Sequence, residues 1–322
     1  MFAKRRWVYR LAIVIVPLSG QATQDRQTFS LHDSILLFGI YDNLRLVTPA
    51  QVLEIKPPVE VGNTNQGYFV YPSLSPRGDL VAWGFVVGWQ DDRPRYRARF
   101  ALGLYSIKER KWKTYGDFDD IGTPTFSPDA SKIAFVALDP IKGYHMLLFD
   151  VATEKMTIMV NVSAKGNPEK GIQGIPEKST LGWSPDGKRL VVQFQRREKP
   201  SLIAVLDPNT GDVQPIADGV DPAWSPTGEW IAYYDPPGER CMLVQPDGTG
   251  VKMVRKVHST LFNRRGYGYA VVWSPDGKKL LLNEVSEERA IEVVLFDLQT
   301  GRSTIRKTEN GFVAFGWVAQ RK

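Results

Sequence analysis

The sequence contains one cysteine, Cys241, and only three histidines among its 322 residues. A single thiol cannot form an intramolecular disulfide, and the apolar segment around Cys241 predicts a buried side chain rather than a nucleophile. His32, His145 and His258 lie far apart in the sequence, so a metal site built from several imidazoles is not expected. The sequence therefore predicts neither a disulfide framework nor a metal centre.

Short motifs of catalysis are also missing. The chain has no Gly-x-Ser-x-Gly, no His-Glu-x-x-His, no Cys-x-x-Cys and no glycine loop for phosphate. We therefore expect no catalytic residue and no cofactor. One enzymatic alternative stays open, because loops could bring Asp120 and Asp221 together as a carboxylate pair that acts on glycosidic bonds.

No apolar run reaches the ~20 residues that a membrane-spanning helix needs. A shorter run, residues 11–18, follows a basic segment and precedes the small residues Gly20 and Ala22. The basic residues of this segment are Lys4, Arg5, Arg6 and Arg10. This order is typical of a secretory signal peptide cleaved after Ala22, with retention as a membrane anchor as the alternative. We expect a signal peptide (1–22), a short extended arm (23–34) and an exported folded domain (35–322), periplasmic or secreted, with no membrane span after cleavage.

An excess of acidic residues is absent as well, and the formal net charge is +6. The leader holds four basic residues and no acid, so the remainder has 41 − 4 = 37 basic against 35 acidic residues, a net charge of +2. Such a nearly balanced domain lacks the basic excess typical of nucleic-acid binding. We expect no nucleic-acid partner.

One sequence motif recurs along the chain. Trp-Ser-Pro-Asp-Gly-Lys stands at residues 183–188 and 273–278, and looser copies begin at Leu74, Phe126 and Trp224. Proline fixes φ, aspartate bonds to backbone N–H groups, and glycine accepts a positive φ, so each copy predicts a strand, a tight turn and a second strand. The residues expected to form turns and core are Trp183, Asp186, Gly187, Trp224, Trp273, Asp276, Gly277 and Trp317.

A second hairpin follows each copy, for example around the Thr-Gly turns at residues 209–211 and 299–301. Two hairpins form four antiparallel strands, which is one propeller blade. The spacing predicts an all-β fold, a six-bladed β-propeller of four-stranded antiparallel blades. Residues 163–179 interrupt the period as a loop without a strand pattern.

The N-terminal group of strands lacks the first strand of its blade. Residues 314–322 align with residues 270–278, which places Trp317 at the position of Trp273. We therefore expect the C-terminal strand to complete the N-terminal blade and so close the ring. Closure removes the exposed edges of an open sheet.

The turns are expected on one face of the ring and irregular loops on the other, where function usually resides. The candidate binding residues in these loops are Arg196, Arg197, Arg264, Arg265, Tyr267, Tyr269, Asp117, Asp119 and Asp120. Arginine and tyrosine dominate many binding hot spots, so an acidic protein or peptide is the expected partner. A separate row, Arg95, Arg97 and Arg99, alternates along one strand face and is expected to be solvated, with binding of an acidic ligand as the alternative.

The repeated Trp-Ser-Pro-Asp-Gly-Lys motif resembles the WD-like (PD) repeat of the TolB family, and the resemblance covers residues 35–322. The resemblance implies a periplasmic six-bladed propeller that binds a lipoprotein partner in the Tol–Pal system of the cell envelope. TolB also carries an α/β domain before its propeller, and residues 23–34 are too few for one. We expect a monomeric, non-enzymatic module that binds a protein or peptide. The alternative is an enzyme or lectin that acts on glycans.

Overall fold

The structure, a computed structural model, describes parts of the chain that lie within the compact unit His32–Lys322. These parts are residues 33–39, 43–48, 51–56, 72–92, 95–139, 143–163, 172–174, 181–196, 199–237, 239–257, 271–285, 291–307 and 313–319. Their regular structure consists of β-strands, as the repeat predicts. They include no helix that is long and apolar enough to cross a membrane.

The strands pair into antiparallel sheets, most of which are built from consecutive segments. One contains β4 (Ser73–Leu74), β5 (Leu80–Asp92), β6 (Arg95–Ser106) and β7 (Lys111–Phe118). Another contains β18 (Val220–Trp224), β19 (Ile231–Asp235), β20 (Arg240–Val244) and β21 (Lys252–Lys256). The next contains β22 (Val271–Trp273), β23 (Lys279–Val285), β24 (Ile291–Asp297) and β25 (Ser303–Lys307).

Two sheets carry an additional strand. The first contains β8 (Asp120–Ile121), β9 (Thr125–Phe126), β10 (Lys132–Asp139), β11 (Gly143–Asp150) and β12 (Lys155–Ser163). The second contains β13 (Ile172–Gly174), β14 (Gly182–Trp183), β15 (Leu190–Arg196), β16 (Leu202–Leu206) and β17 (Val213–Asp218). The expectation that residues 163–179 hold no strand is wrong, because β13 pairs with the end of β15 through Ile172 and Arg196.

The C-terminal strand joins the N-terminal sheet, whose order is β26-β1-β2-β3. Its members are β26 (Val313–Ala319), β1 (Asp33–Gly39), β2 (Asn43–Val47) and β3 (Val52–Ile55). In the antiparallel register of β1 and β26, Ile35 lies opposite Trp317. The predicted pairing of the two ends of the folded chain is therefore confirmed.

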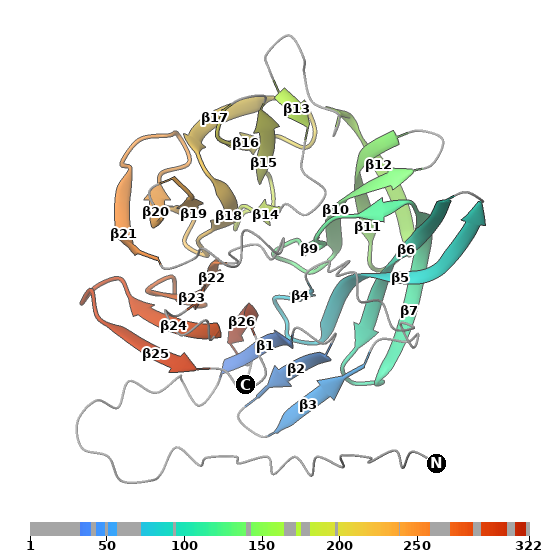
Figure 1. The fold of residues 1–322 in the computed structure, drawn as a ribbon, viewed down its shortest axis with the longest axis horizontal. Coiled ribbons are helices and arrows are strands. Elements are labelled where there is room, and N and C mark those ends of the chain that lie inside the picture. The colour runs from blue at the N-terminus through green and yellow to red at the C-terminus, as the bar shows by residue number, and fades with distance from the viewer. Residues whose placement is uncertain are drawn as a thin grey trace, which may run out of the picture. The chain divides into compact units, whose positions relative to one another are not determined.

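The sheets are arranged in a ring, with short inner strands around a central space and outer strands at the rim (Figure 1). The inner strands contact one another in a closed cycle: β4, β9, β14, β18, β22, β26 and again β4. This arrangement of antiparallel blades is an all-β propeller. The repeat places a tight turn after most of these inner strands, so these turns gather on one side of the central space.

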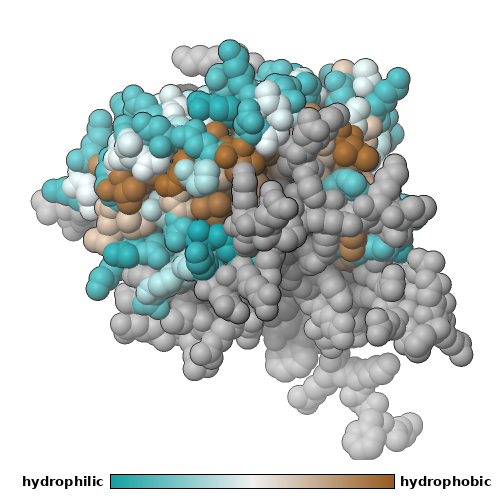
Figure 2. Space-filling view, turned by 90° about the horizontal axis from the view of Figure 1, so that it is seen from above, coloured by the Kyte–Doolittle hydropathy of each residue, from teal (hydrophilic) through white to brown (hydrophobic). Residues whose placement is uncertain are grey.

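Apolar side chains fill the space between neighbouring blades. The strand after each repeated turn is buried on both faces, which explains why its apolar residues are continuous rather than alternating. In β15, Leu190, Val191 and Val192 are all fully buried. Figure 2 views the rim of the ring, where apolar residues form an interrupted band with hydrophilic residues on either side.

Two buried amides connect neighbouring blades at corresponding repeat positions. Asn283 of β23 donates from Nδ2 to the Ala314 carbonyl at 2.9 Å and accepts the Ala314 N–H at 2.8 Å. Gln193 of β15 accepts the Asp221 N–H at 3.1 Å. Each amide thus fixes the inner strand of the next blade, and Asn283 does so for the C-terminal strand.

Candidate functional site: the central cavity

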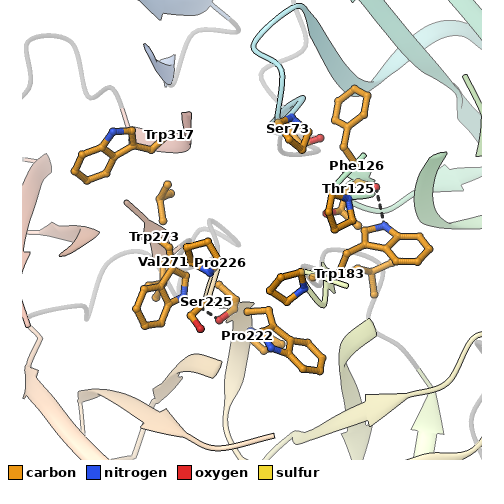
Figure 3. A pocket seen from close by; sticks show the side chains of 18 of the residues that line it. Ser73, Thr125, Phe126, Trp183, Pro222, Ser225, Pro226, Val271, Trp273 and Trp317 are labelled. Atoms are coloured by element: carbon orange, nitrogen blue, oxygen red, sulfur yellow. Dashed lines mark hydrogen bonds between the residues drawn. The ribbon is translucent and has the colours of Figure 1, made fainter. Parts of the chain in front are cut away.

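A cavity of about 490 Å³ lies where the inner strands meet (Figure 3). Its wall consists of the inner strands and of the Ser-Pro turns that follow them. Tryptophan, proline and other apolar residues make up most of this wall. The lining residues labelled in Figure 3 are Ser73, Thr125, Phe126, Trp183, Pro222, Ser225, Pro226, Val271, Trp273 and Trp317.

Two tryptophans of the wall, Trp183 and Trp273, are held by backbone carbonyls of the preceding blade. Trp183 donates from Nε1 to the Thr125 carbonyl at 3.3 Å, and Trp273 donates to the Ala223 carbonyl at 3.0 Å. Trp273 is only 7% exposed. Trp273 belongs to a buried core cluster, and the partly buried Trp183 packs against another cluster. The hydrogen bonds fix the orientation of both indoles.

The turns beside the cavity pack against one another around the ring. A Cβ atom built on Gly187 would lie 3.8 Å from the Pro128 ring, and one built on Gly228 would lie 3.7 Å from the Pro185 ring. Both glycines adopt a positive φ, 69° at Gly187 and 81° at Gly228. The cavity is therefore bordered on this side by fixed backbone and proline rings.

The serines and aspartates of these turns are occupied by the turn itself. Ser184 donates from Oγ to Asp186 Oδ1 at 2.5 Å. Ser184 Oγ also accepts the Arg189 N–H at 2.9 Å. Ser127 donates to Asp129 in the same way, and this hydrogen bond is the main cause that lowers the pKa of Asp129 to about 2. These interactions support the prediction that the residues form turns.

Besides Thr125 and the turn residues Ser225 and Ser274, three polar residues lie in the cavity wall. Thr123 is 7% exposed, and its hydroxyl has no hydrogen-bond partner within the described part of the chain. The Ser73 hydroxyl is likewise buried without a partner among these residues. Asp221 is 6% exposed and adopts a φ of 50°, which is uncommon for a residue other than glycine. Asp221 supplies the only ionisable side chain of the described lining.

The predicted acidic cluster is engaged within the protein. Arg99 binds Asp117 Oδ1 through Nε at 2.8 Å and also pairs with Asp119 through Nη1. The hydrogen bond to Asp117 is the largest of the effects that raise the pKa of Arg99. Asp120 Oδ1 accepts the Ile121 N–H at 2.8 Å, and Asp120 is not among the described cavity residues, whereas Asp221 is.

Of the two predicted basic pairs, only Arg196 lies within the described residues. Arg196 donates from Nε to the Pro200 carbonyl at 2.8 Å and from Nη2 to Asp218 at 2.6 Å. Its side chain is therefore tied to its own blade. The other predicted binding residues lie outside the described residues: Arg197, Arg264, Arg265, Tyr267 and Tyr269.

Cys241 is fully buried in β20, and this burial raises the pKa of its thiol to about 12. A thiol with such a pKa stays protonated near neutral pH, so it is a poor nucleophile. In the described parts of the chain, no group of three or more His, Cys, Asp or Glu side chains is placed to hold a metal ion.

The fold and the cavity together define the protein as an all-β propeller with an apolar central cavity. No protein-family model matches the chain, and no curated protein matches its sequence. Several solved structures match the fold of the chain. TolB from Acinetobacter baumannii matches with a TM-score of 0.63 at 15% identity, over 88% of this chain and 66% of that protein.

A TolB candidate from Agrobacterium tumefaciens matches with a TM-score of 0.54 at 18% identity, over 90% of this chain and 99% of that one. A chain of a nidogen/laminin complex matches with a TM-score of 0.58 at 10% identity, over 89% and 97% of the two chains. The chain spans slightly less than two thirds of the Acinetobacter TolB. The structural similarity to TolB propellers, predicted from the repeat, is thus confirmed, and at these identities it establishes the fold alone.

Proposed function

We propose that this protein is an exported propeller of six blades that binds a protein or peptide partner in the cell envelope. The central cavity is the observation that supports this proposal. Ligand sites are concave and mostly apolar, with a few polar groups that orient the ligand. The cavity combines indole and proline walls with the hydroxyls of Ser73 and Thr123 and the carboxylate of Asp221.

The residues of the cavity wall favour binding over catalysis. A catalytic nucleophile is usually activated by an adjacent base within hydrogen-bond reach. The described lining offers one ionisable side chain, Asp221. Its turn serines are bonded within their own turns, Ser274 to Asp276 and Ser225 to Thr227. A rigid cavity with few hydrogen-bonding groups suits a short peptide segment with apolar or proline residues.

The TolB-type propellers that this chain resembles in structure make an envelope location a natural proposal. The leader at residues 1–22 adds support from the sequence. We propose cleavage after Ala22, which N-terminal sequencing of the mature protein should show as a chain that starts at Thr23. A mature protein that still begins at residue 1 would refute the cleavage.

A second contact region is proposed for the loops with the basic pairs. Arg197, Arg264 and Arg265 would attract acidic side chains of the partner, and Tyr267 and Tyr269 would add apolar contact. Arg196 is less suited to this role because Asp218 and the Pro200 carbonyl already hold it.

A photo-crosslinking residue in place of Ser73 tests the cavity directly. Ser73 lies in the wall, so a probe at this position is placed beside a ligand in the cavity, and the substitution breaks no described hydrogen bond of the hydroxyl. The matched control carries the same probe at Gln299, an exposed position in the turn after β24 and outside the cavity. Both proteins are irradiated in an envelope extract and their adducts are identified by mass spectrometry.

We expect one polypeptide adduct at position 73, absent at position 299 and suppressed by an excess of the unmodified protein. With the crosslinked polypeptide in hand, the triple change Arg197→Ser, Arg264→Ser and Arg265→Ser should slow association and flatten its salt dependence. Equal adducts at both positions, or none at position 73, would contradict the proposal.

A further inference from the structure

A second concave site lies away from the central cavity, between two neighbouring blades. It is a groove of about 460 Å³ between the sheet of β14–β17 and the sheet of β18–β21. One wall contributes Arg189 and Gln214. The other contributes Glu229 and Trp230 and the turn at residues 245–247. None of these residues lines the central cavity.

Several hydrogen-bond donors of the groove are unused by the described part of the chain. Within it, the Arg189 guanidinium forms no ion pair and lies over the Trp224 ring, 5.1 Å from its centroid. The indole N–H of Trp230 forms no hydrogen bond to a described residue. The Gln245 side-chain amide uses its oxygen to accept from Thr249 at 2.7 Å, which leaves its NH₂ group as a third donor.

Acceptors stand beside these donors. The exposed Glu229 carboxylate forms no ion pair with a described residue. Asp247 uses Oδ1 to accept from Thr249 at 2.7 Å, so its other carboxylate oxygen is available. Gln214 donates to the Asp247 carbonyl at 3.5 Å and keeps its side-chain oxygen as an acceptor.

The charges of the groove balance. Arg189 is positive, and Glu229 and Asp247 are negative. The Lys252 ammonium lies 3.8 Å from the centroid of the Trp230 ring and supplies a second positive charge at the edge of the groove. An anionic polymer would therefore be repelled by the two carboxylates, and a cationic polymer by Arg189 and Lys252. A neutral ligand is repelled by neither set of charges.

From this arrangement we propose that the groove is a binding site for a neutral oligosaccharide. Each sugar hydroxyl both donates and accepts a hydrogen bond, which matches a wall where donors and acceptors alternate. Because Lys252 covers one face of the Trp230 ring, the apolar contact comes from Pro246 and the indole edge rather than from stacking on that face. This inference concerns a different site from the proposed peptide cavity and does not depend on it.

Saturation-transfer NMR with the full-length protein tests the proposal, with cellotetraose, maltotetraose and a tetramer of N-acetylglucosamine as the probes. At least one of the three should receive saturation from the protein. Gln214→Ala removes a side-chain amide from the groove, and Glu229→Gln replaces one charged acceptor oxygen by an NH₂ donor. Each change should weaken that binding about tenfold. The matched controls, Gln299→Ala and Glu109→Gln, change exposed residues of the same types elsewhere and should leave it unchanged.

Melting temperatures equal to that of the wild type show that the four variants are folded. The proposal is overturned if none of the three oligosaccharides binds, or if binding persists undiminished in both groove variants. It is also overturned if the groove variants lose binding of the crosslinked polypeptide instead, because the groove would then belong to a peptide interface. Failure of the Ser73 crosslinking experiment alone would leave the saccharide site untouched.

Discussion

The amide of Asn283 should be one of the most important polar groups for the stability of the ring. Asn283 is 1% exposed, and it bonds both the N–H and the carbonyl of Ala314, which is fully buried in the C-terminal strand. Asn283→Ala leaves two buried backbone groups without a partner. Each such group costs about 1–3 kcal/mol. We expect the free energy of unfolding to fall by about 3–5 kcal/mol in total, measured by urea denaturation.

A second substitution separates hydrogen bonding from packing. Asn283→Leu keeps a side chain of similar size but removes both hydrogen bonds, so it should be destabilising to a similar extent. If packing were the main contribution of Asn283, leucine would restore most of the lost stability. Asn209→Ala is the control, because Asn209 is exposed in the turn after β16 and its loss should change stability by no more than about 0.5 kcal/mol.

Gln193→Ala should cost less than Asn283→Ala. Gln193 accepts one backbone N–H of the next blade, whereas its NH₂ group donates to Ser201, a side chain that is only half-buried. The expected order is therefore Asn283→Ala, then Gln193→Ala, then Asn209→Ala. The reasoning is refuted if both variants of Asn283 unfold within about 0.5 kcal/mol of the wild type.

Three further outcomes follow from the same structure. Deletion of residues 313–322 should open the sheet edge at β1 and remove buried Trp317, a loss of at least about 3–5 kcal/mol; a truncated chain that stays monomeric and melts normally would contradict the closure of the ring. Gly277→Val should cost about 1–2 kcal/mol or more, because Gly277 has a φ of 70° and its new Cβ would lie 2.9 Å from Thr227; an unchanged melting temperature would be the contrary result. The folded pKa of Asp129, about 2, lies below the ~3.9 of an unfolded aspartate, so its stabilising effect is present above about pH 4 and is lost toward about pH 2. Asp129→Asn should therefore unfold with a smaller pH dependence in that window, by less than about 1 kcal/mol because the carboxylate is exposed, and identical pH profiles would count against the assignment.

Local turn chemistry is the part of this molecule that the sequence predicts best. A glycine after Ser-Pro-Asp has to accept a positive φ in such a turn, and Gly187 and Gly277 do so at 69° and 70°. The repeat also predicts which segments are equivalent. For that reason the pairing of the C-terminal strand with β1, far apart in sequence, could be expected from the alignment of Trp317 with Trp273.

Interactions that depend on strand register could not be predicted in the same way. Arg99 was expected to be solvated, but its side chain is 14% exposed and binds two aspartates across the β6–β7 hairpin. The register of this hairpin shifts between Phe100 and Leu102, immediately after Arg99. Such a bulge changes which residues lie opposite one another, and simple alternation along a strand does not reveal it.

The sequence did not predict the hydrogen bonds of Gln193 and Asn283 to the neighbouring blade, for a different reason. A single Gln or Asn in an apolar strand has the same composition signal whether it faces solvent or a neighbouring blade. A comparison between repeats could have found the link, because Gln193 follows Trp183 at the same spacing as Asn283 follows Trp273. β13 was missed because its three residues are too few to produce a strand pattern.

The same comparison between repeats explains where the polar groups of the central cavity come from. Thr123 stands before Phe126 at the spacing by which Ala314 precedes Trp317, so it occupies the position that a neighbouring amide binds elsewhere. In the preceding blade the amide position is Gly84, which has no side chain. Gly84 therefore offers no side-chain amide to the backbone at Thr123. The Thr123 hydroxyl itself is buried in the cavity wall without a described partner. The position three residues before the aromatic residue thus carries Thr123 in one blade, Asp221 in another and Ala314 in a third. Because the side chain at this position varies from blade to blade, two of the blades place a polar group in a wall that is otherwise mostly apolar.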